Sequence, residues 1–258
     1  MREKSREEVL TLENVSKHFG GVKAVDEVSL SVKKGERRLL IGTNGAGKTT
    51  LFNLITGDLP SSAGSIHMFG REVTKLPVHK RVRMGMHRTY QTSALFDGLT
   101  VRQNFCMAVI GDGNVPGHFN FWGQIKNNTS ANELALKAAV QVGLENKMET
   151  DASDLSHGEK RQLELGLAIV GNPALIMFDE LCSGLSSDER RTMLELIRLL
   201  DKDVTLILIE HDMDVAFAVA DIITVMYEGR VLVEGTSEDI RSNIQVRQIY
   251  LGGDVTGV

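Results

Sequence analysis

The stretch that decides the fold reads Gly42-Thr43-Asn44-Gly45-Ala46-Gly47-Lys48-Thr49. A glycine, four further residues and then Gly-Lys-Thr form a loop in which backbone amides can encircle phosphate oxygens, because glycines place no Cβ in the way. An apolar run at 39–41 precedes the loop, as expected of a buried parallel strand, and a helix is predicted at 49–55. The N-terminus of that helix favours an anion. The stretch therefore predicts a phosphate-binding loop.

Each position of this loop has an expected role. The segment from Gly42 to Thr50 is predicted to bind the phosphates of a magnesium nucleotide, namely ATP with Mg²⁺. Lys48 is expected to reach the β and γ phosphates, and the hydroxyl of Thr49 to ligate Mg²⁺. The loop alone does not separate a kinase, a GTPase and a motor ATPase, so the rest of the chain has to decide.

The amino-acid composition argues against a nucleic-acid partner. The 258 residues are 42% hydrophobic and 24% charged, as in an ordinary globular protein. A net charge of −5 and only 5% aromatic residues do not favour nucleic-acid binding, and we expect no nucleic-acid partner. The basic run at 79–83 is expected to be a solvated helix face. Cys106 and Cys182 lack metal spacing and fit a reducing cytosol.

No segment is predicted to enter a membrane. The start, residues 1–8, is highly charged and does not resemble a signal peptide, and no stretch approaches the roughly 18 apolar residues of a transmembrane helix. We expect any membrane role to be exercised from the surface through a partner.

The pattern of apolar residues predicts an α/β protein with a mostly parallel central sheet, because strand–loop–helix units alternate with buried strands. The first strands are expected to form an antiparallel side sheet, and a helical segment is inserted between sheet strands. Strands are predicted at 9–15, 22–32, 39–41, 65–69, 174–178 and 204–209, with a hairpin of 223–227 and 231–233. Helices are predicted at 49–55, 132–142, 159–170, 187–200 and 237–250, with a helical pattern from about 78 and an irregular loop at 111–130.

Two helix starts carry a capping signature. Ser156 is followed three residues later by Glu159, and Ser186 by Glu189. A hydroxyl and a carboxylate at this spacing satisfy each other's backbone amides, so each pair is predicted to form a capping box.

Three further segments follow the loop in a fixed order. They are Asp154-Leu155-Ser156-His157-Gly158-Glu159-Lys160-Arg161-Gln162, Ala174-Leu175-Ile176-Met177-Phe178-Asp179-Glu180 and Ile209-Glu210-His211-Asp212. With the phosphate loop, they resemble the signature motif, Walker B strand and switch histidine of the ATP-binding cassette (ABC) family. Gln91 matches the Q-loop of that family, and Phe19 matches the aromatic residue that stacks on adenine. The resemblance covers roughly residues 9–251.

The resemblance implies a P-loop NTPase fold of the RecA-like type, as one ABC ATPase domain over 9–251. Its parts would be a catalytic core with a β subdomain at 9–91 and 171–235, a helical signature subdomain at 92–170 and a helical tail at 236–258.

The resemblance also implies the chemistry of ATP hydrolysis. Asp179 would hold Mg²⁺ together with Thr49 and Gln91. Glu180 would orient and polarise the attacking water, while His211 would stabilise charge on the γ-phosphate. Phosphoryl transfer needs mainly positioning and charge neutralisation, which this set supplies.

A second cassette is part of the implied site. In the resembling family two cassettes pack head to tail, so Ser156, Gly158 and Glu159 would complete the nucleotide site of the partner cassette. The helix behind Ser156 would offer its N-terminus to a γ-phosphate.

Finer features resemble the branched-chain amino acid (Liv) importer ATPases. They are the segments 85–91, 208–213 and 248–252; urea and amide importer ATPases look similar. The resemblance implies an ATPase peripheral to the cytoplasmic face of a bacterial inner membrane. Its partners would be two permease subunits, and indirectly a periplasmic solute-binding protein, with Gln91 near the permease groove.

Rival classes remain as alternatives. A non-transport ABC ATPase typically carries a long coiled coil or two cassettes in one chain. A P-loop kinase or GTPase would lack the signature and His211. A regulatory module that binds ATP without turnover is disfavoured by Glu180 and His211. Two departures from the family, Leu181 in place of proline and Ser186 in place of Asp or Asn, bear on coupling between the two nucleotide sites.

Overall fold

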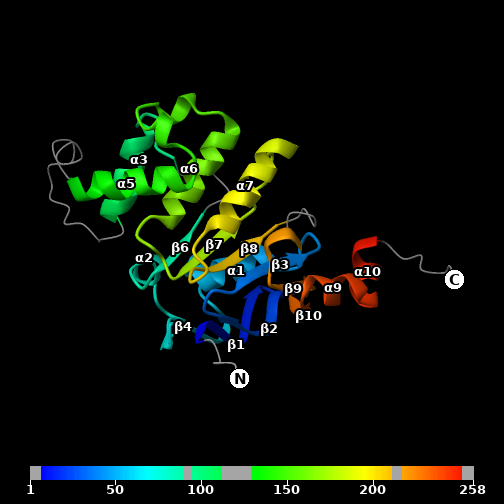
Figure 1. Ribbon diagram of the computed structural model, residues 1–258. Coiled ribbons are helices and arrows are strands. Elements are labelled where there is room, and N and C mark those ends of the chain that lie inside the picture. The colour runs from blue at the N-terminus through cyan, green and yellow to red at the C-terminus, as the bar shows by residue number, and fades with distance from the viewer. Residues whose placement is uncertain (1–6, 90–94, 112–128, 211–216, 252–258) are drawn as a thin grey trace, which may run out of the picture. The chain divides into compact units, whose positions relative to one another are not determined.

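The computed structural model describes residues 7–89, 95–111, 129–210 and 217–251 (Figure 1). Contacts within the chain define two compact units. The first joins residues 1–84 to 202–258, and the second spans 85–201. Each unit is described separately below.

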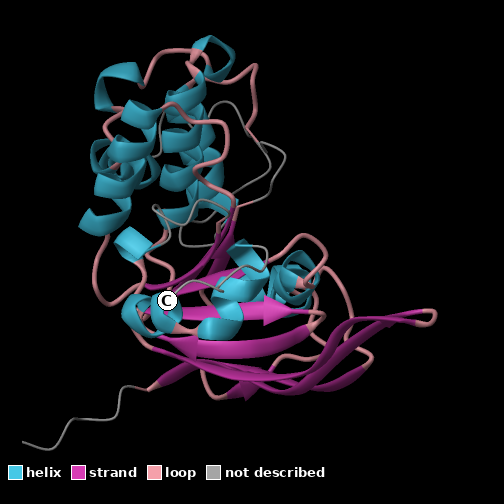
Figure 2. Ribbon diagram, turned by 90° about the vertical axis from the view of Figure 1, so that its right-hand side faces the viewer, coloured by secondary structure: helices cyan, strands magenta, loops and turns pink. Residues whose placement is uncertain are grey.

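A four-stranded antiparallel sheet begins the first unit, in the order β2-β1-β4-β5. Its strands are β1 (Glu8–Phe19), β2 (Val22–Lys33), β4 (Ala63–Met68) and β5 (Arg71–Glu72). Side chains of β2 alternate between buried and exposed, as in a half-buried strand. The first two strands form the long hairpin visible among the magenta strands of Figure 2. This is the predicted antiparallel side sheet, although β1 extends four residues beyond the predicted end at 15.

A second, mostly parallel set of strands lies in the same unit. The strands are β3 (Arg37–Gly42), β8 (Thr205–Ile209), β9 (Ile222–Tyr227) and β10 (Arg230–Gly235). β3 pairs in parallel with both β8 and β9, so Leu40 lies opposite Ile209 on one side and Thr224 on the other. β10 returns antiparallel to β9. The predicted α/β fold with a parallel sheet, an antiparallel side sheet and the hairpin is therefore confirmed.

The helices of this unit whose bounds are described are α1 (Lys48–Thr56), α2 (Val78–Val82), α9 (Ser237–Ser242) and α10 (Ile244–Leu251). The single helix predicted at 237–250 is in fact two, because Asn243 adopts an extended conformation. Its side-chain oxygen accepts a hydrogen bond from the Val246 amide at 3.1 Å, which caps the start of α10.

The second unit contains mostly helices, with one pair of strands. β6 (Met86–Arg88) pairs in parallel with β7 (Leu175–Asp179). The helices are α3 (Val101–Gly111), α5 (Thr129–Gln141), α6 (His157–Ile169) and α7 (Ser187–Leu199), with short 3₁₀ turns at Glu145–Lys147 and Ala152–Asp154. α3, α5 and α6 pack against one another (Figure 1). The unit also includes β6, β7 and α7, whereas the helical subdomain was predicted as 92–170; that boundary stays a prediction.

The basic run at 79–83 is only partly a solvated face. His79, Lys80 and Arg83 are exposed, but the Arg81 side chain is 1% exposed, so the prediction is wrong for this residue. Its guanidinium donates to the carbonyls of Leu54 and Ile55 at 2.8 and 2.6 Å, and also to those of Leu76 and Thr74. The first two carbonyls belong to the last turn of α1, where no intrahelical donor remains. Burial lowers the pKa of Arg81 to about 10, so it stays charged at neutral pH.

Replacing Arg81 therefore tests how α1 is held at its end. We expect Arg81→Ala to lower the free energy of unfolding by about 2–4 kcal/mol, because several buried carbonyls lose their donor. Arg81→Lys should recover little, since one ammonium cannot reproduce the planar fork. Arg83→Ala is the control, with a change within about 0.5 kcal/mol. Urea unfolding measures all three; equal values for the two alanine variants would contradict the capping role.

Candidate functional site

The predicted phosphate loop connects the end of β3 to the start of α1. β3 ends at Gly42. Gly47, which directly precedes the first helical residue, has a φ of 97°. The Ala46 amide donates to the Thr43 carbonyl at 3.1 Å, and the Leu51 amide to the Gly47 carbonyl at 2.8 Å. No side chain caps α1 in this structure. The amides of the first turn thus begin a helix whose anion-attracting end is not blocked by a capping oxygen.

Two of the loop glycines are required by their neighbours. A Cβ on Gly47 would lie 2.2 Å from the Ala24 carbonyl oxygen, and one on Gly42 would lie 2.5 Å from that of Met226. Gly45 has a φ of 80° but open space around it. The backbone of β2 and the end of β9 therefore approach the loop so closely that only glycine fits at 42 and 47.

The turn between β9 and β10 supports the loop from outside. The Gly229 amide donates to the Ala46 carbonyl at 3.1 Å, and the Asp26 amide to the Gly229 carbonyl at 2.8 Å. The Arg230 guanidinium donates two hydrogen bonds to the Asp26 carboxylate, from Nε at 2.9 Å and from an Nη at 2.6 Å. Hydrogen bonds from Arg230 and then Lys23 hold the pKa of Asp26 below its usual range. Sequence reasoning missed this pair, because its partners lie 204 positions apart.

The predicted lysine lies inside the loop. Lys48 is 6% exposed, and its ammonium donates to the carbonyls of Gly42 and Thr43 at 2.7 and 3.0 Å. Asn44 and Gly45 are exposed, as is Thr49 in the first helical turn, and Thr50 is half-buried. A positive charge is thus held at a loop whose rim is open to a ligand from solvent.

Phe19, at the end of β1, is not a core residue. Its side chain is 50% exposed, and the Lys17 ammonium lies 5.2 Å from the ring centroid. An exposed aromatic ring offers a face on which a flat base can stack.

The second unit holds the predicted acidic pair. β7 is buried along its whole length, and Asp179, at its end, is 3% exposed. The Asp179 amide donates a hydrogen bond to the hydroxyl oxygen of Thr89 at 3.4 Å. Glu180 follows with a φ of 55°, a left-handed conformation that is strained for a residue with a Cβ. Such strain persists where surrounding structure fixes it and gathers at functional sites.

Both predicted capping boxes are confirmed. Ser156 caps α6 with Glu159, and Ser186 caps α7 with Glu189. The carboxylate of Glu159 accepts from the Ser156 amide at 2.8 Å, which lowers the pKa of that carboxyl. The pKa of Glu189 is lowered first by the Ser186 hydroxyl. Glu189 also accepts from the amide of Gly158 in the signature segment at 3.1 Å, a contact that the sequence did not predict.

Some predicted site residues fall in segments that the structure does not describe. Gln91 and His211 lie outside the described residues, as does most of the predicted irregular loop at 111–130. Among the residues that the structure describes, no helix is both long and apolar enough to cross a bilayer.

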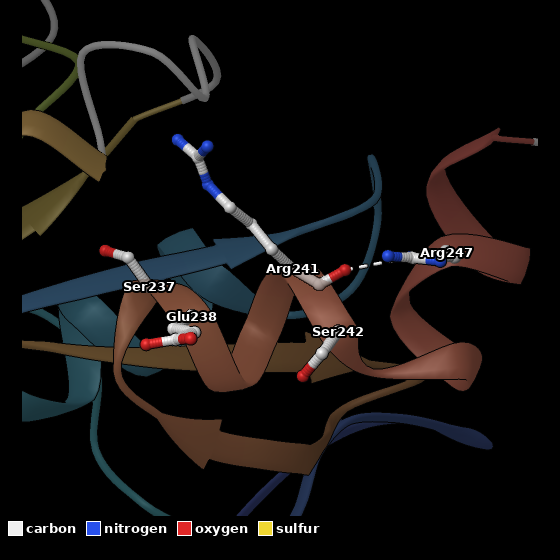
Figure 3. Close-up of a pocket in the computed structure, with 5 residues that line it drawn as sticks. All are labelled: Ser237, Glu238, Arg241, Ser242 and Arg247. Carbon is white, nitrogen blue, oxygen red and sulfur yellow. Dashed lines mark hydrogen bonds between the residues drawn. The ribbon is translucent and has the colours of Figure 1, made fainter.

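An open hollow of about 450 Å³ lies along α9 and α10, where Arg247 donates to the Arg241 carbonyl at 2.8 Å (Figure 3). None of the described residues that line this hollow is predicted to bind nucleotide.

The residues predicted to hold Mg²⁺ have suitable chemistry. Within the described ranges no group of three or more His, Cys, Asp or Glu side chains could hold a metal ion. Mg²⁺ at a nucleotide, however, takes most ligands from phosphates and water and needs only one or two protein oxygens. An exposed threonine hydroxyl at 49 and a carboxylate at 179 are oxygen donors of that kind.

A glycine loop between a parallel strand and an uncapped helix, with a lysine inside it, defines a P-loop nucleoside triphosphatase. Comparison with known families matches residues 25–183 to the family described as ABC transporter. The chain belongs to this family and is an ATPase of the transport type.

Individual relatives align with this chain over nearly their whole length. The chain is 34% identical over 249 residues to the high-affinity branched-chain amino acid transport ATP-binding protein BraF of Pseudomonas aeruginosa, covering 95% of this chain and 98% of that protein. It is 35% identical, with the same coverage, to the corresponding protein LivG of Salmonella typhimurium.

Solved structures show the same fold. MJ1267, an ATP-binding cassette of an ABC transporter, superposes with a TM-score of 0.84 at 31% identity, over 95% of this chain and 100% of that one. Its ADP conformation gives a TM-score of 0.83 at 30% identity, over 96% and 100%. Cassettes of this family bind ATP and ADP.

A pair of glycine substitutions tests the fit of the loop. We expect Gly47→Ala to lower the free energy of unfolding by about 2–4 kcal/mol, because the new Cβ meets the Ala24 carbonyl in a positive-φ conformation. Gly45→Ala meets no atom within 4 Å and should cost about 1 kcal/mol, from φ alone. Thermal and urea unfolding of the nucleotide-free protein compare the two. Equal losses would show that neighbours do not constrain the loop.

Proposed function

We propose that this chain energises the uptake of branched-chain amino acids as the ATP-hydrolysing subunit of an importer. The observation that carries the proposal is the similarity over 95% of the chain to proteins named for this transport, in a chain that keeps the phosphate loop. A related small polar solute such as urea is the alternative cargo.

ATP binds in the loop from Gly42 to Thr50. The amides of the loop and of the first turn of α1 surround the phosphates, and Lys48 adds its charge to the β and γ phosphates. Phe19 stacks on adenine. The exposed ring of Phe19 and the exposed rim of the loop support this assignment, since both are accessible from solvent within the first unit.

Hydrolysis uses the residues that follow β7. Asp179 holds Mg²⁺ together with Thr49 and Gln91, and the bound ion neutralises phosphate charge. Glu180 orients and polarises the attacking water, and His211 stabilises charge at the γ-phosphate. The left-handed backbone at Glu180 supports a dedicated placement of that carboxylate.

A second cassette completes each nucleotide site. ABC ATPase cassettes work as dimers with membrane permeases. Here Ser156, Gly158 and Glu159 of one cassette contact the nucleotide held by the other in a head-to-tail dimer. The start of α6 supports this role, because Ser156 and His157 are exposed at a helix N-terminus.

The assembly operates at a membrane. Two permease subunits bind the cassettes at the cytoplasmic face of a bacterial inner membrane, close to Gln91, and a periplasmic binding protein delivers the solute. A regulatory module or a non-transport ABC ATPase is the alternative class, and solute uptake distinguishes it from an importer.

Uptake by cells tests the solute and the chemistry together. We expect a chromosomal Glu180→Gln change to reduce uptake of labelled leucine to background. The purified variant should bind ATP while its kcat for hydrolysis falls about 10²–10⁴-fold, since removing a positioned general base has that effect. The isosteric amide keeps the shape of the site, so retained ATP binding controls for folding.

Three outcomes would contradict parts of this proposal. Hydrolysis at the wild-type rate in the Glu180→Gln variant would contradict the general-base role of Glu180. If the variant cells lost urea uptake and kept leucine uptake, the transported solute would be urea rather than leucine. Unchanged uptake of both solutes alongside lost hydrolysis would favour the non-transport alternative.

A further inference from the structure

The carboxylate of Glu189 joins two helix N-termini. Its Oε2 accepts from the amide and the hydroxyl of Ser186, at 2.9 and 2.7 Å, which caps its own helix α7. Its Oε1 accepts from the Gly158 amide at 3.1 Å, in the first turn of α6. An anionic side chain of one helix is therefore bound at the anion-attracting end of another.

The contact at Gly158 is close. A Cβ on Gly158 would lie 2.5 Å from Oε1 of Glu189 and 2.9 Å from its carboxyl carbon, so the carboxylate lies directly against this glycine. The neighbouring His157 ring stands over Gly184 in the same way, with Nε2 3.1 Å from a Cβ built there. The segment after Glu180 and the signature segment thus meet at two points within the second unit.

One amide hydrogen cannot form a full-strength hydrogen bond to two anions at once. The Gly158 amide has a single hydrogen, and a hydrogen bond to a carboxylate uses it. The proposed function gives this same amide, with Ser156, to the phosphate of a nucleotide held by a second cassette. The Glu189 carboxylate and that phosphate also repel each other, because both are negative.

We propose that Glu189 occupies the signature amide as an internal substitute for the nucleotide phosphate, and that ATP must displace it before the two cassettes close. This inference rests on the proposed function, in particular on the role of Gly158. Glu189 is a positioning residue whose charge opposes closure in the absence of ATP. It sets the ATP concentration at which the assembly operates.

The capping box of α9 provides a matched comparison. Asp239 caps α9 by accepting from the amide and hydroxyl of Thr236 at 2.8 and 2.7 Å, nearly the distances of Glu189. Asp239 belongs to the first unit, whereas the signature segment belongs to the second. Asp239→Asn therefore removes a capping carboxylate without touching the Gly158 amide.

The test uses the ATPase assembly that copurifies with a tagged chain, and measures KM for ATP and kcat separately. Glu189→Gln keeps a side chain that serves in capping boxes and removes the charge. We expect the KM for ATP to fall about tenfold, as removal of ~1.4 kcal/mol of opposition implies, with kcat within about twofold. Glu189→Asp keeps the charge, so its KM for ATP should stay closer to the wild-type value. The KM of Asp239→Asn should equal the wild-type value.

The outcomes separate this inference from the proposed function. An unchanged or raised KM in Glu189→Gln would overturn the substitution of phosphate by Glu189. A lowered kcat with unchanged KM would also overturn it and leave Glu189 as a clamp that only holds the signature segment. An assembly without ATPase activity even with the wild-type chain would remove the proposed function itself, and the inference with it.

Discussion

The close approach of backbone to the phosphate loop is the constraint on which the rest depends. Gly47 fits only because it lacks a Cβ beside Ala24, and Gly229 holds the Ala46 carbonyl from the β9–β10 turn. Two segments outside the loop, β2 and the β9–β10 turn, thus fix the loop before any ligand arrives. A site held in this way loses little conformational freedom on binding, which favours affinity. Arg81 adds to this rigidity at the other end of α1.

The second unit uses helix N-termini in a different way. α1 starts without a side-chain cap, whereas α6 and α7 start with capping boxes, and the two boxes are connected through Glu189. The uncapped helix α1 follows the loop that we propose binds phosphate in its own chain. The capped helix α6 carries the signature, whose ligand is proposed to come from a second cassette. Keeping a carboxylate at this end satisfies the helix while the partner nucleotide is absent.

Local features of this structure could be predicted from the sequence, whereas distant pairings could not. The capping boxes at 156–159 and 186–189 depend on residues three positions apart, and the phosphate loop on eight consecutive ones. Asp26 and Arg230 meet across 204 positions, and Gly158 and Glu189 across 31, so no short pattern reveals either. The prediction for Arg81 was wrong because a run of charges normally indicates a solvent-exposed face. Its burial is made favourable by backbone carbonyls of α1 and of residues 74 and 76.

Hydrogen–deuterium exchange in the loop tests the central claim most directly. Backbone amides of residues 42–51 would be followed by mass spectrometry with and without saturating Mg-ADP, with saturation established by calorimetry on the same sample. The account predicts that these amides exchange about tenfold more slowly with the nucleotide, because phosphate accepts their hydrogen bonds, while amides at the start of β1, residues 8–13, are unaffected. Unchanged exchange at 42–51 under saturating nucleotide would contradict the claim that this loop is the nucleotide site.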